Sequence, residues 1–115
     1  MIERYTLPEM GQIWTEHAKF QSWLEVEMAA CQANCELGLL SKEDLVQIKE
    51  KAQFDVSRIK EIEKEVKHDV IAFLTNLNEY VGESGRFIHV GMTSSDVLDT
   101  GLSLQLRAAC NLLID

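Results

Sequence analysis

Residues 94–115, at the C-terminal end of the sequence, read SSDVLDTGLSLQLRAACNLLID. The charged residues of this stretch are few, and its apolar side chains cover nearly every face of a helix. A helix that is apolar all round is typical of the interior of a large protein or a helical bundle. The pattern stops at Asp115 without the Gly, Asn or Pro that commonly ends a helix, so we expect the chain to end inside it. The predicted organisation is an N-terminal helical domain, residues 1–93, followed by the truncated start of a central helical-bundle domain.

The part of the chain before Thr93 predicts a small all-α domain. Thr15, Ser41 and Asp55 each precede apolar residues at three- and four-residue spacing, so each is a candidate N-cap. The predicted helices cover residues 8–14, 15–38, 41–52, 55–66 and 69–80. Gly82 to Gly85 break the helical pattern, and we expect residues 86–91 to form an irregular or short extended connection.

The charge balance excludes several classes of partner. The chain has 11 basic and 19 acidic residues, giving a formal net charge of -8. Nucleic-acid binders concentrate positive charge, whereas the charges between Arg58 and Glu65 alternate in sign. No apolar run approaches the ~20 residues of a bilayer span, and the first residues lack the pattern of a secretion signal. We expect neither a nucleic acid nor a membrane as partner.

The three cysteines, Cys31, Cys35 and Cys110, are too few for a zinc site, which typically uses paired Cys-x-x-Cys elements. We interpret them as small core residues of a protein in the reducing cytoplasm. The sequence therefore predicts no metal.

Arg4 and Tyr5 form the first candidate site. A guanidinium offers forked donors and a phenol adds a hydroxyl, so the pair could clamp an anion. A solvated Arg beside a packing Tyr is the simpler alternative.

Lys67, His68 and Asp69 form the second candidate site, between a charged helix and an apolar one. The imidazole could donate to a bound carboxylate or phosphate, and Asp69 could accept from a hydroxyl or an amine. His68 could equally be a helix-junction residue that binds no ligand.

The third candidate site is the segment His89-Val90-Gly91-Met92-Thr93-Ser94-Ser95-Asp96. Thr93 and Ser94 present hydroxyls beside the free N–H groups of a helix N-terminus, which attracts anions. Capping alone would explain Ser and Asp at a helix start. It does not explain why His89 and Gly91 precede them.

These segments, taken together, resemble the adenylosuccinate lyase family over essentially the whole chain. The Thr-Ser-x-Asp element is shared across the fumarase/aspartase superfamily, whereas the Arg-Tyr start combined with Lys-His-Asp indicates the adenylosuccinate branch. The matching segments occur in this order: Met1-Ile2-Glu3-Arg4-Tyr5, Pro8-Glu9-Met10, Ile13-Trp14, Phe54-Asp55, Ile62-Glu63-Lys64, Lys67-His68-Asp69-Val70 and His89-Val90-Gly91-Met92-Thr93-Ser94-Ser95-Asp96-Val97-Leu98-Asp99-Thr100.

The resemblance implies a cytoplasmic homotetramer that releases fumarate from adenylosuccinate and from the succinocarboxamide ribotide SAICAR. Each site would be built from three subunits without a metal or organic cofactor. A histidine acid and a serine base on a flexible loop would move the protons, and both would lie beyond Asp115. We therefore expect the 115-residue chain alone to be inactive.

The resemblance also implies roles for the candidate residues. Arg4 and Tyr5 would bind the nucleotide end of the substrate, and Lys67 and Asp69 would line the pocket. The remaining residues would lie nearer the reaction: His68 would position substrate and support catalysis, His89 would lie near the substrate, and Thr93 and Ser94 would contact the succinyl group.

Two other functions remain compatible with the sequence. One is a free-standing helical interaction module, in which the last helix docks on a partner. The other is a different superfamily member, such as a carboxymuconate cycloisomerase, which shares Thr-Ser-x-Asp but needs no nucleotide clamp.

Overall fold

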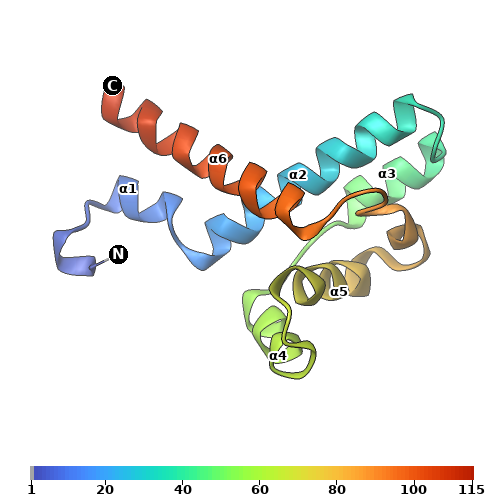
Figure 1. The fold of residues 1–115 in the computed structure, drawn as a ribbon, viewed down its shortest axis with the longest axis horizontal. Helices are drawn as coiled ribbons and strands as arrows, with labels where there is room; N and C mark the ends of the chain where they lie inside the picture. The colour runs from blue at the N-terminus through green and yellow to red at the C-terminus, as the bar shows by residue number, and fades with distance from the viewer. Residues whose placement is uncertain (1) are drawn as a thin grey trace.

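The computed structural model describes residues 2–115, and all regular structure in this range is helical (Figure 1). The predicted all-α fold is confirmed. The elements, in chain order, are η1 (Glu3–Tyr5), α1 (Pro8–Ile13), α2 (Glu16–Glu36), α3 (Lys42–Lys51), α4 (Val56–Val66), α5 (Asp69–Val81), η2 (Gly82–Phe87) and α6 (Ser94–Ile114).

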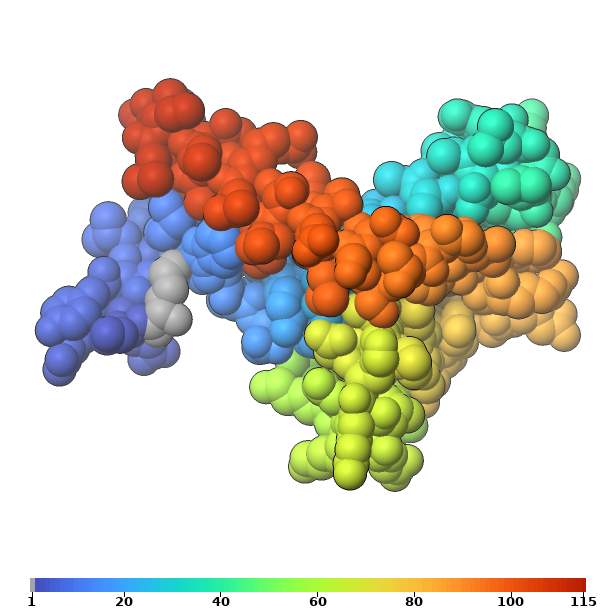
Figure 2. Space-filling model, in the orientation of Figure 1, coloured from blue at the N-terminus to red at the C-terminus, as the bar shows by residue number. Residues whose placement is uncertain are grey.

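The described chain is elongated. Its Cα radius of gyration is 15.3 Å and its extents are 46 × 35 × 24 Å, whereas a compact domain of this length would have a radius of about 13 Å. Helix α6 accounts for much of this shape, because it packs along α2 and continues past it to α1. In Figure 2 the last turns of α6, in red, and the N-terminal segment, in dark blue, make up one end of the molecule.

The predicted helix starts at Thr15, Ser41 and Asp55 are confirmed by their hydrogen bonds. Each side-chain oxygen accepts from the backbone N–H three residues later, at 3.0 Å for Thr15, 3.1 Å for Ser41 and 2.9 Å for Asp55. These bonds satisfy donors that a helix leaves free in its first turn.

Aromatic side chains from α2 and α5 form the centre of the core. Phe20 stacks on Phe73 with ring centroids 5.9 Å apart, and Trp23 meets Phe73 edge-on at 5.6 Å. The interior also takes in Cys31, while Cys35 is partly buried against it. Cys110 is exposed on α6, so the interpretation of all three cysteines as core residues is wrong for that one.

Helix α6 confirms the predicted long final helix, and its two faces have different surroundings. Val97 and Ala109 are buried toward the body of the chain, and Gln105 donates from Nε2 to the carbonyl of Ile13 at 2.9 Å. Leu98 and Leu104 are half-buried, whereas the large apolar side chains of α6 that are exposed are Leu102, Leu106, Leu112, Leu113 and Ile114. The described residues therefore cover only one face of a helix that is apolar nearly all round.

The connection between α5 and α6 is more regular than predicted. Residues 82–87 form the 3₁₀ helix η2 instead of breaking the helical pattern. Gly85 permits this geometry because a Cβ there would lie 2.2 Å from the Asn78 side-chain oxygen. Only the turn after Ile88 is irregular, with positive φ at His89 and Gly91, and it contains no strand.

Among residues 2–115, no helix is both long enough and apolar enough to span a bilayer.

Candidate functional site

His68 caps the start of α5, which places its ring at the junction of two helices. Helix α4 ends at Val66, its capping residue Lys67 has a left-handed φ of 53°, and the chain then becomes extended at His68. The Nδ1 atom of His68 accepts a hydrogen bond from the N–H of Ile71 at 3.2 Å. Because Nδ1 accepts, the proton of a neutral ring lies on Nε2. The junction role weighed for His68 is present, and Nε2 remains free to donate.

The Nε2 atom of His68 faces the first residue of α6. Its distance to Ser94 Oγ is 3.4 Å, longer than a typical hydrogen bond. This contact joins residues 26 positions apart in the chain and brings the N-termini of α5 and α6 together. Both helices therefore direct the positive ends of their dipoles into one region, which favours an anionic ligand.

Asp69 does little to orient the His68 ring. Its Oδ1 accepts from the N–H of Val70 at 2.8 Å, and it lies 3.9 Å from Nδ1 of His68. About half of each side chain is exposed. Asp69 and Lys67 thus flank the His68 ring on the surface, where a ligand could reach them.

The start of α6 is held by Asp96, whose Oδ2 accepts from the N–H of Thr93 at 2.9 Å. Asp96 thereby fixes the backbone of Thr93 while the Thr93 side chain stays exposed. Ser94 is half-buried on the side of His68. The hydroxyls of Thr93 and Ser94 therefore have different surroundings, although both residues are hydroxyl-bearing neighbours at the same helix start.

His89 faces the core through one ring nitrogen. Its Nδ1 lies 2.6 Å from Oε1 of Glu27, a carboxylate on α2 whose side chain is 0% exposed. Burial raises the pKa of Glu27, and the hydrogen bond and charge of His89 act in the opposite direction. The resemblance implies that His89 lies near the substrate, and no sequence pattern indicated Glu27 as its partner.

Glu27 could have been found from helix periodicity. It lies four residues after Trp23 and four before Cys31, and all three are buried on one stripe of α2. A carboxylate inside an apolar stripe requires a partner, because an isolated buried charge is strongly unfavourable. The periodicity does not reveal that the partner is 62 residues away.

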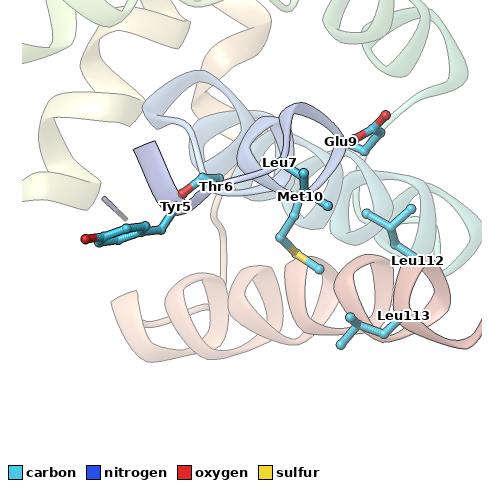
Figure 3. A pocket seen from close by; sticks show the side chains of 7 residues that line it. All are labelled: Tyr5, Thr6, Leu7, Glu9, Met10, Leu112 and Leu113. Carbon is cyan, nitrogen blue, oxygen red and sulfur yellow. The ribbon is translucent and has the colours of Figure 1, made fainter. Parts of the chain in front are cut away.

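Arg4 and Tyr5 lie at the other end of α6. The Arg4 guanidinium is 4.8 Å from the centre of the exposed Tyr5 ring. Tyr5 lines an apolar groove of about 590 Å³ that also includes Met10, Leu112 and Leu113. Figure 3 shows Met10 directed toward α6 and the Tyr5 ring directed away from it. A helix of 21 residues is about 30 Å long, so this pair is remote from Ser94.

The structure thus unites two of the three candidate sites. His68 meets Ser94 where α5 and α6 begin, and Lys67, Asp69 and Thr93 are their neighbours along the chain. It leaves Arg4 and Tyr5 at the opposite end of α6 and directs Nδ1 of His89 into the core.

Adenylosuccinate lyases are similar to this chain over its whole length. The chain is 62% identical over 115 residues to the adenylosuccinate lyase of Synechocystis sp. and 51% identical over 114 residues to that of Bacillus subtilis. The alignments cover 100% and 99% of this chain, but 27% and 26% of those relatives. The chain therefore spans about a quarter of the length of the curated relatives it matches.

Two solved structures share the fold. A 3-carboxy-cis,cis-muconate lactonizing enzyme from Pseudomonas putida superposes with a TM-score of 0.87 and 28% identity, over 95% of this chain and 26% of that one. A fumarate lyase from Mesorhizobium sp. BNC1 gives a TM-score of 0.82 at 22% identity, over 90% of this chain and 25% of that one, which supports the fold alone. The family described as lyase matches residues 3–115, and the chain therefore belongs to the lyase family.

Proposed function

We propose that this chain is the N-terminal part of an adenylosuccinate lyase. The enzyme would cleave adenylosuccinate to AMP and fumarate, and SAICAR to AICAR and fumarate, by general acid/base elimination. The observation that carries the proposal is the meeting of His68 and Ser94 at two helix N-termini, in a chain that is 62% identical to such an enzyme.

The helix starts suit the succinyl end of the substrate, which carries two carboxylates. The hydroxyls of Thr93 and Ser94 and the free N–H groups of α6 would bind one carboxylate. Nε2–H of His68 and the ammonium group of Lys67 would add donors beside it. In the elimination, a base removes a carbon-bound proton and an acid protonates the leaving nitrogen. Donors near the succinyl group would stabilise the carbanion that forms between these steps.

Arg4 and Tyr5 would bind the nucleotide phosphate in a site completed by another subunit. The stacked guanidinium and phenol offer N–H and O–H donors, but they lie past the last turns of α6. A mononucleotide is much shorter than the ~30 Å of this helix. The distance between the two ends supports sites that take residues from more than one subunit, and we propose a homotetramer in which three subunits contribute to each site.

The proposed domain boundary lies between residues 93 and 94, where the capped start of α6 follows the turn. Helix α6 would be the beginning of the first long helix of a central bundle, and its exposed leucines support an additional covering layer. We place the enzyme in the cytoplasm, without a metal or organic cofactor and without a nucleic-acid or membrane partner.

The decisive experiment measures fumarate release by the full-length protein. Adenylosuccinate and SAICAR should both be cleaved, and His68→Ala should lower turnover strongly. His17→Ala is the matched control, because His17 is an exposed histidine on α2. Turnover of 3-carboxymuconate in place of both purines would identify a cycloisomerase, which the 28% identical structure keeps as the second candidate. A reading frame that stops after Asp115 would favour the interaction module.

A further inference from the structure

The bond between Glu27 and His89 ties the middle of α2 to the turn that precedes α6. It joins a fully buried carboxylate to a ring with 20% of its side chain exposed, over 2.6 Å. The thiol of Cys31, one helical turn further along α2, also senses the charge of Glu27. Burial and the negative charge of Glu27 raise the pKa of Cys31 to about 11, so this thiol is uncharged at neutral pH.

Glu27 depends on His89 as its partner. Its second oxygen, Oε2, is buried and has no hydrogen-bond partner among residues 2–115. A carboxylate that is out of water and holds one hydrogen bond is strongly destabilised if that bond is lost. Loss of the bond to Nδ1 would therefore lower the free energy of unfolding substantially.

The backbone on the other side of the bond is held in an unfavourable conformation. His89 has a φ of 70°, a region that side chains with a Cβ avoid, and Gly91 follows at 77°. The N–H of Met92 donates to the carbonyl of His89 at 3.2 Å, closing a turn two residues before Ser94. Ile88 is buried just before this turn. The Glu27 bond and the Ile88 anchor thus fix the path by which the chain enters α6.

The second ring nitrogen of His89 stays accessible. Within the described range, Nε2 makes no hydrogen bond, and the one buried side-chain polar atom without a partner is Oε2 of Glu27. Nε2 therefore keeps contact with solvent. Because Nδ1–H donates to Glu27, Nε2 is the ring atom left for a ligand oxygen or a proton.

We propose that Glu27 is a positioning residue that acts through His89. Its carboxylate holds the ring by Nδ1, fixes the turn before α6, and leaves Nε2 facing the substrate, where the protonated form of the ring would donate from Nε2–H to an anionic group. The role of His89 toward substrate rests on the proposed lyase function. The contact by which Glu27 fixes the ring and the turn is independent of that function.

The test compares three variants of the full-length protein. Glu27→Met fills the same space but cannot accept a hydrogen bond, whereas Glu27→Gln keeps an acceptor for Nδ1–H. Glu25→Gln is the matched control, because Glu25 is exposed on the same helix. We expect Glu27→Met to lower kcat/KM for adenylosuccinate at least tenfold, Glu27→Gln to stay within threefold of wild type, and Glu25→Gln to be unchanged.

A double variant shows whether the effect passes through His89. In a His89→Gln background, Glu27→Met should cause little further loss of kcat/KM, because coupled residues are not additive. An equal additional loss in that background, or wild-type kcat/KM in a folded Glu27→Met variant, would overturn the proposal. If Glu27→Met does not fold, Glu27→Asp replaces it, since the shorter side chain withdraws the carboxylate from the ring, and the same loss is expected.

Nuclear magnetic resonance of ¹⁵N-histidine-labelled protein gives a readout independent of activity. The His89 signal, identified by its absence in His89→Gln, should show a proton on Nδ1 in the wild type and in Glu27→Gln, and lose it in Glu27→Met. A wild type without a proton on Nδ1 would refute the positioning role. A wild type that cleaves no adenylosuccinate but keeps this proton would refute the lyase proposal while supporting the Glu27 contact.

Discussion

At the scale of single residues, His68 combines two roles that one substitution would mix. Its Nδ1 caps α5, and its Nε2 faces Ser94. Replacement by alanine removes both, and the loss of an N-cap alone costs ~0.5–2 kcal/mol. Asparagine is a favourable N-cap that cannot replace the imidazole at Nε2.

His68→Asn should therefore separate the roles of this residue. We expect the melting temperature to stay near wild type, whereas kcat for adenylosuccinate falls ~10²-fold or more, the effect expected for a group that acts in proton transfer or charge stabilisation. Steady-state kinetics and thermal melts on the same preparation measure both. A normal kcat in a stable His68→Asn variant would show that His68 acts only as an N-cap.

Ser94 and Thr93 should differ in their effects. Ser94→Ala removes the hydroxyl nearest His68, and we expect a ten- to hundredfold loss of kcat/KM, the equivalent of ~1.5–3 kcal/mol for a charge-assisted bond. Its melting temperature should change little. If Thr93→Ala and Ser94→Ala both melt early and the surviving folded enzyme works normally, the two residues are only caps.

Glu27 predicts a pH dependence of stability. Burial raises its folded pKa above the ordinary value of 4.5, so the folded state keeps this proton to a higher pH than the unfolded state does. The stability that the protonated Glu27 carboxyl contributes to the folded state is fully present below pH 4.5, and it is lost as pH rises through the raised pKa. Glu27→Gln lacks this titration.

Across this pH window, the melting temperature of Glu27→Gln should therefore rise relative to that of the wild type as pH increases. Glu25→Gln should follow the wild-type curve, because its carboxylate is exposed. Parallel curves for wild type and Glu27→Gln would show that the carboxylate has the same pKa folded and unfolded.

At the scale of helices, Gly101 controls the packing of α6 on α2. A Cβ at this position would lie 2.8 Å from Cδ1 of Trp23 and 3.1 Å from Oγ of Ser22, and both side chains are buried. Gly101→Ala should destabilise the protein, because overpacking costs ~1–3 kcal/mol and exceeds the ~1 kcal/mol gain in helix propensity. Ser103→Ala, at an exposed site of α6, is the control. A denaturation midpoint at or above wild type for Gly101→Ala would contradict this close approach.

The helices also show how far local chemistry determines structure. Thr15, Ser41 and Asp55 could be predicted as caps because their bonds span three residues. The His68 cap was not predicted, since histidine is an uncommon N-cap. Helix η2 was missed because glycines usually signal a break, whereas Gly85 is required there by close contact with Asn78.

Tertiary contacts are the part of the candidate site that the sequence did not reveal. The residue types at the starts of α5 and α6 indicated anion binding, but not that the two starts meet. The partnership of Glu27 and His89 depends on a chain reversal between positions 62 residues apart, which no short pattern encodes.

At the scale of the whole molecule, the two separated ends of α6 predict complementation between subunits. Arg4→Ala should mainly raise KM, because a phosphate is bound similarly in ground and transition states. His68→Asn should mainly lower kcat. If one site uses Arg4 and His68 from different subunits, mixed oligomers of the two variants contain some sites with both native residues. Activity above either parent after dissociation and remixing would support this arrangement, and simple averaging would count against it.

The 115-residue chain alone should show no lyase activity. In the proposed enzyme the proton-transferring acid and base lie outside it, and loss of one such group commonly costs ~10²–10⁴-fold. The assay follows adenylosuccinate absorbance with purified chain. Turnover that is proportional to the chain and survives repurification would contradict the expectation.

The close approach of Gly101 to Trp23 also has an optical consequence. The indole is 2% exposed and lies where α6 crosses α2. Separation of the two helices would admit water to the ring and shift its fluorescence to longer wavelength. Trp14 is the other tryptophan of the chain. Replacing it with phenylalanine leaves Trp23 as the single fluorescence reporter of whether α6 is packed on α2.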